Sequence, residues 1–238
     1  MHIRPMPIVE ETNDKSLMTY LMGMGTSIPI GVYVWLVEGA SKNVLIDAGC
    51  SADFLTGIGF PSKQISTQEK ELEKVGLTLD DIDTVIFTHL HVDHAKDAEK
   101  FKNAKFVVQK SELEFAANPH PIQAGWFVQL PKDRLEVVDG DRQIMEGIRV
   151  LHTPGHTPGG QSVLIETNNG PTCLCGLCSI IENFSPPEQL SQMGVPAITP
   201  GIHTNPMQAY DSLIKISGLS DRIIALHDIS YTSMERIP

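Results

Sequence analysis

The sequence predicts an α+β fold in which stacked β-sheets are covered by helices. Short runs of apolar and β-branched residues recur along the 238-residue chain, each bounded by Gly, Pro, Asn or Asp, as strands are. The strands come first in a hairpin-rich block and are later mixed with helices, which suits stacked sheets better than a strict β-α-β alternation. Neither GxGxxG nor GxxxxGK(S/T) occurs, so a nucleotide-phosphate loop is not supported.

The predicted elements follow from local patterns. Strands are predicted at residues 32–37, 43–46, 84–87, 105–108, 135–138, 148–151, 162–165 and 222–226. Residues 66–69 (Ser-Thr-Gln-Glu) resemble a capping box and predict a helix through 71–75. A second helix is predicted at 111–117. A third begins at Asn205-Pro206, because the apolar residues that follow fall on one helical face.

The charge balance disfavours several classes of partner. The chain has 18 basic and 29 acidic residues, a formal net charge of -11, and no run rich in lysine or arginine. We therefore expect a small-molecule substrate, and neither nucleic acid nor a membrane surface as a partner. The N-terminus leads into prolines and acidic residues instead of a signal-peptide core, and no stretch reaches the roughly 18 apolar residues of a membrane helix. We expect a cytoplasmic protein with a single domain over residues 1–238.

One motif carries most of the predicted chemistry. The run Thr-His-Leu-His-Val-Asp-His at 88–94 directly follows a predicted strand, which would deliver its side chains to a loop at a sheet edge. His89, His91, Asp93 and His94 are difficult to bury without a shared cation, because unpaired buried polar groups cost several kcal/mol. Imidazole and carboxylate ligands suit zinc, iron or manganese. The motif therefore predicts a metal site and a metal-dependent hydrolase.

Two further histidines follow predicted strands. The run His-Thr-Pro-Gly-His-Thr-Pro-Gly occupies residues 152–159, and its His156 lies on a turn after the strand, where it is a natural further ligand. His152 is predicted either to support a metal ligand through a hydrogen bond or to have a structural role. His227 directly follows the last predicted strand and is also a candidate ligand, with Asp228 as a hydrogen-bonding neighbour.

These motifs together resemble those of the metallo-β-lactamase-fold hydrolases. The matching elements are Thr-His-Leu-His-Val-Asp-His-Ala at 88–95, the run at 152–159 and the late His227, with Asp47-Ala-Gly similar to the family's Asp-x-Gly strand end. The resemblance spans residues from about 30 to 230. Within the family, residues 29–50 and 200–204 look most like the N-acyl homoserine lactonase branch.

The resemblance implies a four-layer αββα sandwich with one or two metal ions, most simply zinc, along one edge of the paired sheets. It assigns the ligands of the two ions as follows: His89, His91 and His156 for the first, and Asp93, His94 and His227 for the second. Asp47 would orient a ligand histidine through a hydrogen bond. The implied reaction is hydrolysis of a lactone or ester carbonyl by metal-activated water, with Asp93 as the catalytic group that carries the proton.

The sequence departs from the family pattern between residues 171 and 183. The family usually has an aspartate that bridges both metals, and aligning the Glu-Asn-Phe run at 182–184 places that position at Gly176. Cys178 is a candidate thiolate ligand in its place, because zinc accepts sulfur readily; alternatively Cys173, Cys175 and Cys178 all pack as small apolar residues. The tyrosine of the lactonase branch is also missing: the equivalent stretch has Ser179 and Ile180, and Tyr231 is the candidate to compensate for it.

Two alternatives to lactone hydrolysis remain open at this stage. The first is thioester hydrolysis of the glyoxalase II type, and the second is a non-hydrolytic protein with a single metal on the same scaffold. The pocket walls are expected to come from loops. The candidates are the methionine-rich residues 17–24, with core packing as the alternative, and a possible lid at 119–127 that contains His120 and Trp126.

Overall fold

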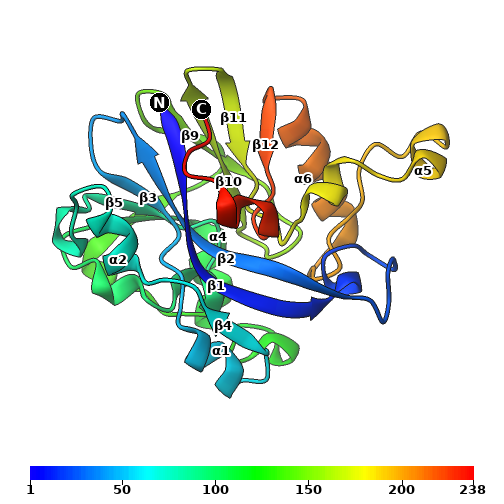
Figure 1. Cartoon of the computed structure of the whole chain (residues 1–238), viewed down its shortest axis with the longest axis horizontal. Coiled ribbons are helices and arrows are strands. Elements are labelled where there is room, and N and C mark those ends of the chain that lie inside the picture. The colour runs from blue at the N-terminus through cyan, green and yellow to red at the C-terminus, as the bar shows by residue number, and fades with distance from the viewer.

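The strand β2 (Ser27–Glu38) separates two hydrophobic cores. Side chains alternate across a strand, so neighbouring residues of β2 enter opposite faces of its sheet. One face of β2 points toward a second sheet and carries Tyr33, Trp35 and Val37. The other face points toward helices and carries Val32, Val34 and Leu36. The computed structural model describes residues 1–238, and Figure 1 shows the two sheets packed together between helices.

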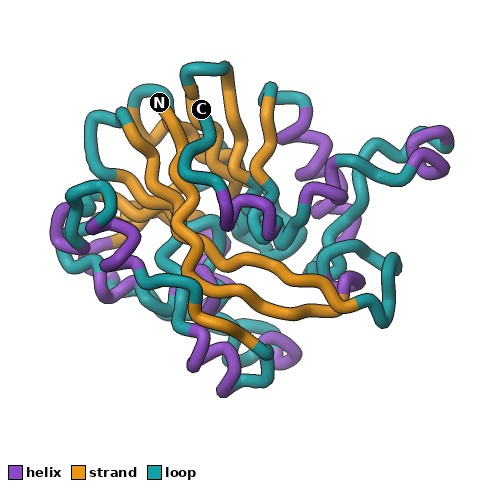
Figure 2. Tube along the Cα trace, viewed as in Figure 1, coloured by secondary structure: helices purple, strands orange, loops and turns teal.

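The larger sheet has seven strands in the order β4-β1-β2-β3-β5-β6-β7. Its other strands are β1 (His2–Asp14), β3 (Val44–Ile46), β4 (Ser62–Gln64), β5 (Thr84–Ile86), β6 (Lys105–Gln109) and β7 (Leu135–Val138). The strands β3, β5, β6 and β7 run parallel to one another, whereas β1 and β2 form a long antiparallel ribbon (Figure 2). Parallel neighbours end at the same edge of the sheet, and this edge carries the site described below.

The smaller sheet has five strands in the order β12-β11-β10-β9-β8. Its strands are β8 (Arg142–Met145), β9 (Ile148–His152), β10 (Gln161–Thr167), β11 (Gly170–Leu174) and β12 (Arg222–Ile224). Only the β11–β12 pair is parallel. The inner faces of the two sheets share one core, to which β9 and β10 contribute Val150 and Val163 and β2 contributes Trp35.

Helices cover both outer faces. The helices are α1 (Ala52–Gly57), α2 (Gln68–Glu73), α3 (Val92–Ala95), α4 (Lys110–Ala117), α5 (Glu188–Gln192) and α6 (Pro206–Ser217). Leu55, Leu72 and Ala116 bring α1, α2 and α4 onto the larger sheet, and Leu213 brings α6 onto the smaller one. The order helix, sheet, sheet, helix confirms the expected four-layer arrangement. None of the helices has the length and apolar character needed to cross a membrane.

The predicted helix starts are close to those observed. Thr67 caps α2 by accepting a hydrogen bond from the Lys70 backbone, and Asn205 caps α6 by accepting two. The predicted strands all coincide with observed ones, which extend further in β2 and β10 and stop earlier in β12. Thus, the residues with strong local patterns fold as expected.

The long first strand was not predicted. Residues 2–14 contain Pro5 and Pro7, which argue against a strand because proline cannot donate a ladder hydrogen bond. The structure resolves this conflict by position: β4 pairs with β1 only at residues 9–11, so the prolines lie where β1 is an edge strand. A register shift between Pro7 and Val9 then re-aims the remaining residues of the strand.

Candidate metal centre

The site begins where two parallel strands end side by side. The last pair in the β3–β5 register is Ile46 opposite Ile86, so the residues that follow these strands meet at one edge. Asp47, which has a left-handed backbone (φ 61), accepts a hydrogen bond from the Thr88 backbone N–H at 2.7 Å and from the Thr88 hydroxyl. Aspartate tolerates that conformation better than most residues. This contact fixes the start of the 88–94 motif.

A short helix then rearranges the motif. We expected a loop throughout, but α3 begins directly after His91 and places Asp93 and His94 in its first turn. The backbone N–H of His94 donates to the His91 carbonyl. This turn folds His94 back toward Asp47, whose carboxylate Oδ2 lies 2.8 Å from His94 Nδ1. The helical turn therefore points the metal-binding side chains of the motif in two different directions.

The first group of possible ligands is formed by His89, His91 and His156. Their ligand atoms all lie within 4.8 Å of one another, and all three side chains are buried. The Nε2 atoms of His89 and His156 are 3.1 Å apart. Two imidazole nitrogens at this distance either share one proton in a hydrogen bond or, when both are unprotonated, repel each other unless a cation lies nearby. The structure thus brings together the histidines that the sequence suggested for one ion.

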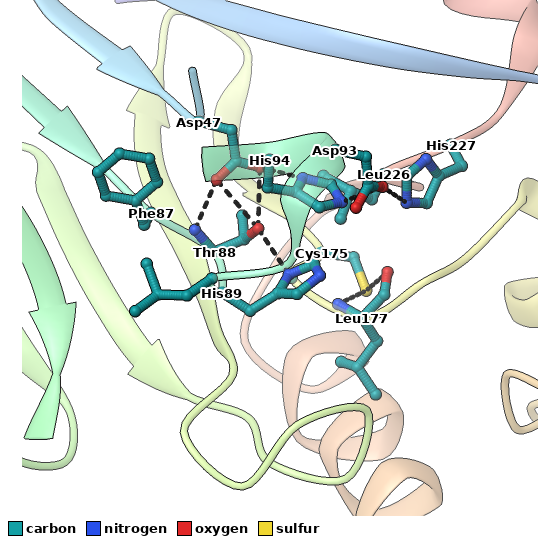
Figure 3. A network of polar contacts seen from close by, with 12 residues as sticks. Asp47, Phe87, Thr88, His89, Asp93, His94, Cys175, Leu177, Leu226 and His227 are labelled. Atoms are coloured by element: carbon teal, nitrogen blue, oxygen red, sulfur yellow. Dashed lines mark hydrogen bonds and ion pairs between the residues drawn. The ribbon is translucent and has the colours of Figure 1, made fainter. Parts of the chain in front are cut away.

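The second group is formed by His89, Asp93 and His94. Asp93 Oδ2 lies 2.9 Å from His94 Nε2 and 3.8 Å from His227 Nε2, so one carboxylate joins two imidazoles from distant parts of the chain. Figure 3 shows this row from Asp47 through His94 and Asp93 to His227. His227 thus lies at the site, as expected.

Hydrogen bonds at the rear of the imidazole rings orient them. The pairs are His94 Nδ1 with Asp47, His89 Nδ1 with Thr88 Oγ1, His156 Nδ1 with the Ile202 carbonyl and His227 Nδ1 with the Gly31 carbonyl, at 2.7–3.0 Å. A carbonyl can only accept, so Nδ1 of the last two histidines carries the proton. This tautomer leaves their Nε2 lone pairs free for a metal ion.

The electrostatics of the site keep most of these imidazoles neutral. Burial, followed by the positive charge of His94, lowers the pKa of His227 to about 4. Burial likewise lowers the pKa of His156 to about 4 and holds that of His89 and His91 well below the usual value. Neutral imidazole is the form that binds metals.

His94 and Asp93 form the charged part of the site. Burial lowers the pKa of His94, but the adjacent carboxylates of Asp93 and Asp47 outweigh it and raise that pKa to about 10. Burial acts to raise the pKa of Asp93, but the surrounding histidines, with His94 foremost, hold it well below its usual range. Asp93 is therefore ionised at neutral pH and available as a ligand.

The donor set fits a divalent cation. The buried Nε2 atom of His91 has no hydrogen-bond partner, and the Nε2 atoms of His89 and His156 face each other at 3.1 Å. A buried polar atom without a partner costs about 1–3 kcal/mol. A metal ion that accepts these lone pairs removes that cost, and a set of imidazoles plus carboxylate suits zinc, iron or manganese.

A cavity of about 420 Å³ opens over these side chains. Its wall is mostly apolar, and it contains no lysine or arginine; the lining residues are Glu11, Asn13, Leu17, Met18, Ile30, Leu55, Phe60, His91, Val92, Asp93, Ile122, Gln123, Trp126, His156, Cys178, Ile202, His203 and His227. Both segments suspected as pocket walls therefore contribute, the 119–127 segment through Trp126 and the 17–24 segment through Leu17 and Met18. Such a cavity accepts an uncharged organic ligand.

Glu11 in this wall was not identified from the sequence. It lies on β1 and is 5% exposed, with Oε2 accepting a hydrogen bond from Asn13 Nδ2 at 2.8 Å. Burial, followed by the negative charge of Asp93, raises the pKa of Glu11 to about 7, against the lowering effect of Asn13 and His94. Because β1 was not predicted, no signal in the sequence placed Glu11 next to the motif.

The raised pKa of Glu11 predicts how stability depends on pH. Between pH 4.5 and about 7, Glu11 is ionised in the unfolded chain but protonated in the folded protein. The free energy of unfolding therefore falls progressively as the pH rises through this range. In metal-free protein, Glu11→Gln should therefore raise the free energy of unfolding by on the order of 3 kcal/mol at about pH 8, and change it little at about pH 4. Urea unfolding with a chelator present measures this difference. An equal effect at both pH values would contradict it, and Glu10→Gln on the same strand is the control.

Other residues named from the sequence have different surroundings. Cys178 lines the cavity and contacts Met18, but it belongs to neither group of ligand atoms, and burial raises its thiol pKa well above the usual value. Its role as a ligand stays a prediction. Cys173 and Cys175 pack in the core under α6, as expected if they serve as small apolar residues and not as metal ligands. All four cysteines are free.

Three polar residues near the motifs have structural contacts. His152 lies on β9 and contacts the Pro158 carbonyl, as expected for a structural residue. Asp228 accepts hydrogen bonds from the backbone of Ile181 and Ser230, and so is a hydrogen-bonding neighbour. Ser179 is fully buried outside the cavity lining, so it does not take the place of the missing tyrosine there.

Glu112 connects the two loops that carry the first group of histidines. Its Oε1 accepts from the Leu90 N–H between His89 and His91, and its Oε2 accepts from the Thr157 hydroxyl and the Gly159 N–H beside His156. The side chain is 0% exposed. A Cβ at Gly159 would lie 2.0 Å from the Glu112 backbone nitrogen, so only glycine allows this approach. This role was not predictable from the sequence, because Glu112 looks like an ordinary polar helix residue.

Comparison with known proteins gives consistent matches. A model of the metallo-beta-lactamase superfamily matches residues 28–176. An N-acyl homoserine lactonase of a Bacillus species is 31% identical over 174 residues, which cover 68% of this chain and 69% of that protein. N-acyl homoserine lactonase AttM of Agrobacterium fabrum is 30% identical over 173 residues, covering 64% of this chain and 66% of that protein.

Solved structures show the same similarity. An N-acyl homoserine lactone hydrolase with its product N-hexanoyl-L-homoserine at the catalytic metal centre has a TM-score of 0.78 and 26% identity, covering 97% of this chain and 94% of that chain. The dizinc quorum-quenching lactonase AidC has a TM-score of 0.69 at 19% identity, covering 98% of this chain and 88% of that chain, a likeness that concerns the fold alone.

Proposed function

This chain belongs to the metallo-beta-lactamase superfamily as a metal-dependent hydrolase, and we propose that it opens the ring of a neutral lactone of the N-acyl homoserine type. The observation that carries the proposal is the cavity over the histidine groups, which is apolar and has no cationic side chain. A neutral lactone with an acyl chain matches both its size and its charge.

The proposed ligands match the first group of donor atoms and differ from the second group in one member, because His227 takes the place of His89. His89, His91 and His156 would hold one zinc ion, and the ligands of the other would be Asp93, His94 and His227. When bound, the metal supplies a nucleophile at neutral pH, because it lowers the pKa of a bound water to ~7, and it polarises the carbonyl under attack. Four free, buried cysteines agree with a reducing cytoplasmic location.

The residues of the chain position the reactants and move the proton. Asp93 is the donor with the most access to the cavity, with a side chain 22% exposed, whereas the five imidazoles are buried. Its carboxylate can take the proton from the attacking water and deliver it to the leaving alkoxide. Asp47 keeps His94 in place during this transfer, and the apolar wall with Trp126 and Phe60 holds the acyl chain and excludes water.

The charge of the substrate also distinguishes the lactone from the main alternative, a glutathione thioester. Glutathione thioesters, the substrates of glyoxalase II, carry carboxylates, and β-lactam antibiotics usually carry one as well. Carboxylates are normally recognised by arginine or lysine. This cavity offers neither and contains the carboxyls of Glu11 and Asp93. We therefore favour the lactone over the glutathione thioester.

A hydrolysis screen tests the proposal. Zinc-loaded protein is expected to open N-hexanoyl homoserine lactone, to lose this activity with a chelator and to regain it with zinc. S-lactoylglutathione should be hydrolysed at least ~100-fold more slowly, since the site leaves its carboxylates unpaired. The readouts are proton release for the lactone and thiol release for the thioester. Faster turnover of the thioester, or chelator-resistant turnover of the lactone, would overturn the proposal.

A further inference from the structure

The segment 199–205 forms a part of the cavity wall that supplies no metal ligand. The backbone N–H of Ile202 donates to the Leu17 carbonyl, and the Ile202 carbonyl accepts a hydrogen bond from His156 Nδ1 at 2.7 Å. The backbone N–H of Thr204 donates to the His156 carbonyl. The segment is therefore held on one side by the N-terminal part of the chain and on the other by a ligand of the first ion, which fixes its position next to the metal centre.

His203 in this segment has an oriented ring and one free nitrogen. It lines the cavity, and its Nδ1 lies 2.8 Å from the Pro200 carbonyl. A carbonyl can only accept, so Nδ1 carries the proton and Nε2 is an acceptor in the neutral imidazole. Tyr20 packs against the His203 ring in an edge-to-face arrangement, with the ring centroids 4.9 Å apart. Nε2 forms no hydrogen bond with the protein and is not among its fully buried polar atoms, so a ligand can reach it.

The other polar side chains of the wall mostly have other partners. Glu11 accepts a hydrogen bond from Asn13, and the remaining histidines of the lining lie in the proposed metal centre. Gln123 Oε1 has no hydrogen-bond partner, but it is fully buried, so a ligand in the cavity does not contact it. His203 belongs to neither group of metal-ligand atoms. Its Nε2 is therefore the acceptor best placed to receive a hydrogen bond from a bound molecule.

A lactone of the N-acyl homoserine type brings one N–H donor into this cavity. Its amide nitrogen is attached to the ring carbon next to the lactone carbonyl, so the N–H lies close to the metal centre when that carbonyl is attacked. The N–H loses its hydrogen bond to water in an apolar cavity, and a donor left unpaired there weakens binding. His203 directly follows Ile202, whose carbonyl orients His156, so its ring lies on the side of the cavity where the N–H needs an acceptor.

We propose that His203 selects for the amide of the substrate by accepting a hydrogen bond from its N–H through Nε2. This inference rests on the proposed function, because it requires that the lactone carbonyl lies at the metal centre. It gives the segment 199–205 a role in substrate choice. The chemical step itself remains with the metal ligands and Asp93, so His203 is a specificity-determining residue.

Two substrates that differ only at the N–H test the assignment. In α-hexanoyloxy-γ-butyrolactone an ester oxygen replaces the amide N–H of N-hexanoyl homoserine lactone, and the ring and acyl chain are the same. Zinc-loaded wild-type protein is expected to open the amide substrate with a kcat/KM about 10–100-fold higher than the ester, measured by chromatography of the ring-opened products. His203→Asn keeps a donor for the Pro200 carbonyl but has no acceptor at the position of Nε2. It should therefore lose most of this preference by a lower kcat/KM for the amide substrate alone.

Matched variants and a binding measurement separate recognition from structure. His203→Gln places an acceptor oxygen near the position of Nε2 and should recover part of the preference. His2→Asn makes the same substitution as His203→Asn at a histidine outside the cavity lining, and it should keep the full preference. The ring-opened product N-hexanoyl-homoserine retains the N–H, so calorimetry should show about 10-fold weaker binding of this product to His203→Asn without any turnover.

The possible results distinguish the role of His203 from the proposed function. Equal losses for both lactones in His203→Asn would indicate a structural role, and loss of the preference in Gln123→Leu instead would place the acceptor elsewhere; each result would overturn the role of His203. Equal kcat/KM values for the two lactones in wild type would overturn it as well. Wild-type protein that opens neither lactone would instead overturn the proposed function itself.

Discussion

Asp93→Ala is expected to lower kcat/KM for lactone opening by about 10³-fold or more. The carboxylate lies between His94 and His227, so its loss removes both a ligand and the proposed proton carrier, and proton transfer alone contributes roughly 10²–10⁴-fold. Metal content should fall along with activity, because His94 and His227 alone do not hold an ion tightly. His91→Ala should act in the same direction through the first group of ligands.

We expect the folded structure to be retained in Asp93→Ala and His91→Ala. A loss of activity in these variants can then be attributed to the metal centre and not to unfolding. Asp47 still pairs with His94 when Asp93 is removed, so the far-ultraviolet circular dichroism and the two-state character of unfolding should remain. Asp53→Ala, which removes an exposed aspartate from the first turn of α1, is the matched control and should retain activity. Full activity or full metal content in Asp93→Ala would contradict the ligand assignment.

Glu112→Ala is expected to reduce the free energy of unfolding by about 3–5 kcal/mol. The substitution leaves the buried donors of Leu90, Thr157 and Gly159 without an acceptor and creates a cavity between α4 and the two loops. Because these loops carry His89, His91 and His156, affinity for the first ion should fall as well. Urea unfolding of metal-free protein measures the first effect and zinc titration the second.

The helix α4 offers its own control for this prediction. Glu114 lies on the same helix but has a side chain that is 66% exposed, near Lys110. Glu114→Ala should change stability by no more than about 0.5 kcal/mol and leave zinc binding unchanged. If Glu112→Ala were as stable as Glu114→Ala, the proposed connection between the loops would have no energetic importance.

Features that depend on neighbouring residues were predictable from the sequence. The strand before the 88–94 motif, the capped start of α6 at Asn205 and the turn position of His156 each follow from patterns over a few residues. The family resemblance, built on those motifs, added the four-layer arrangement and the contact between Asp47 and His94. These expectations agree with the structure because local patterns are maintained when distant segments are packed against them.

Features that depend on distant partners were not predictable. The prolines of β1 are acceptable only because that part of the strand lies at a sheet edge, which cannot be known before the sheet is assembled. Glu11 and Glu112 looked like ordinary polar residues. Glu11 matters because it lines the same cavity as Asp93, and Glu112 matters because it contacts the Leu90 and Gly159 backbone. Similarly, α3 was expected to be a loop, because a single helical turn has almost no pattern of its own.

The sequence by itself determined the chemistry of this protein, and the tertiary structure decided its geometry. The residue types and their close spacing predicted His89, His91 and Asp93 as metal ligands, because few other arrangements stabilise so many buried polar groups. Only the parallel register of β3 and β5 and the course of β1 decided which donors share a cavity, and these depend on packing between segments far apart in the chain. For that reason the histidine motif was evident at once, whereas the carboxyl of Glu11 emerged only from the folded chain.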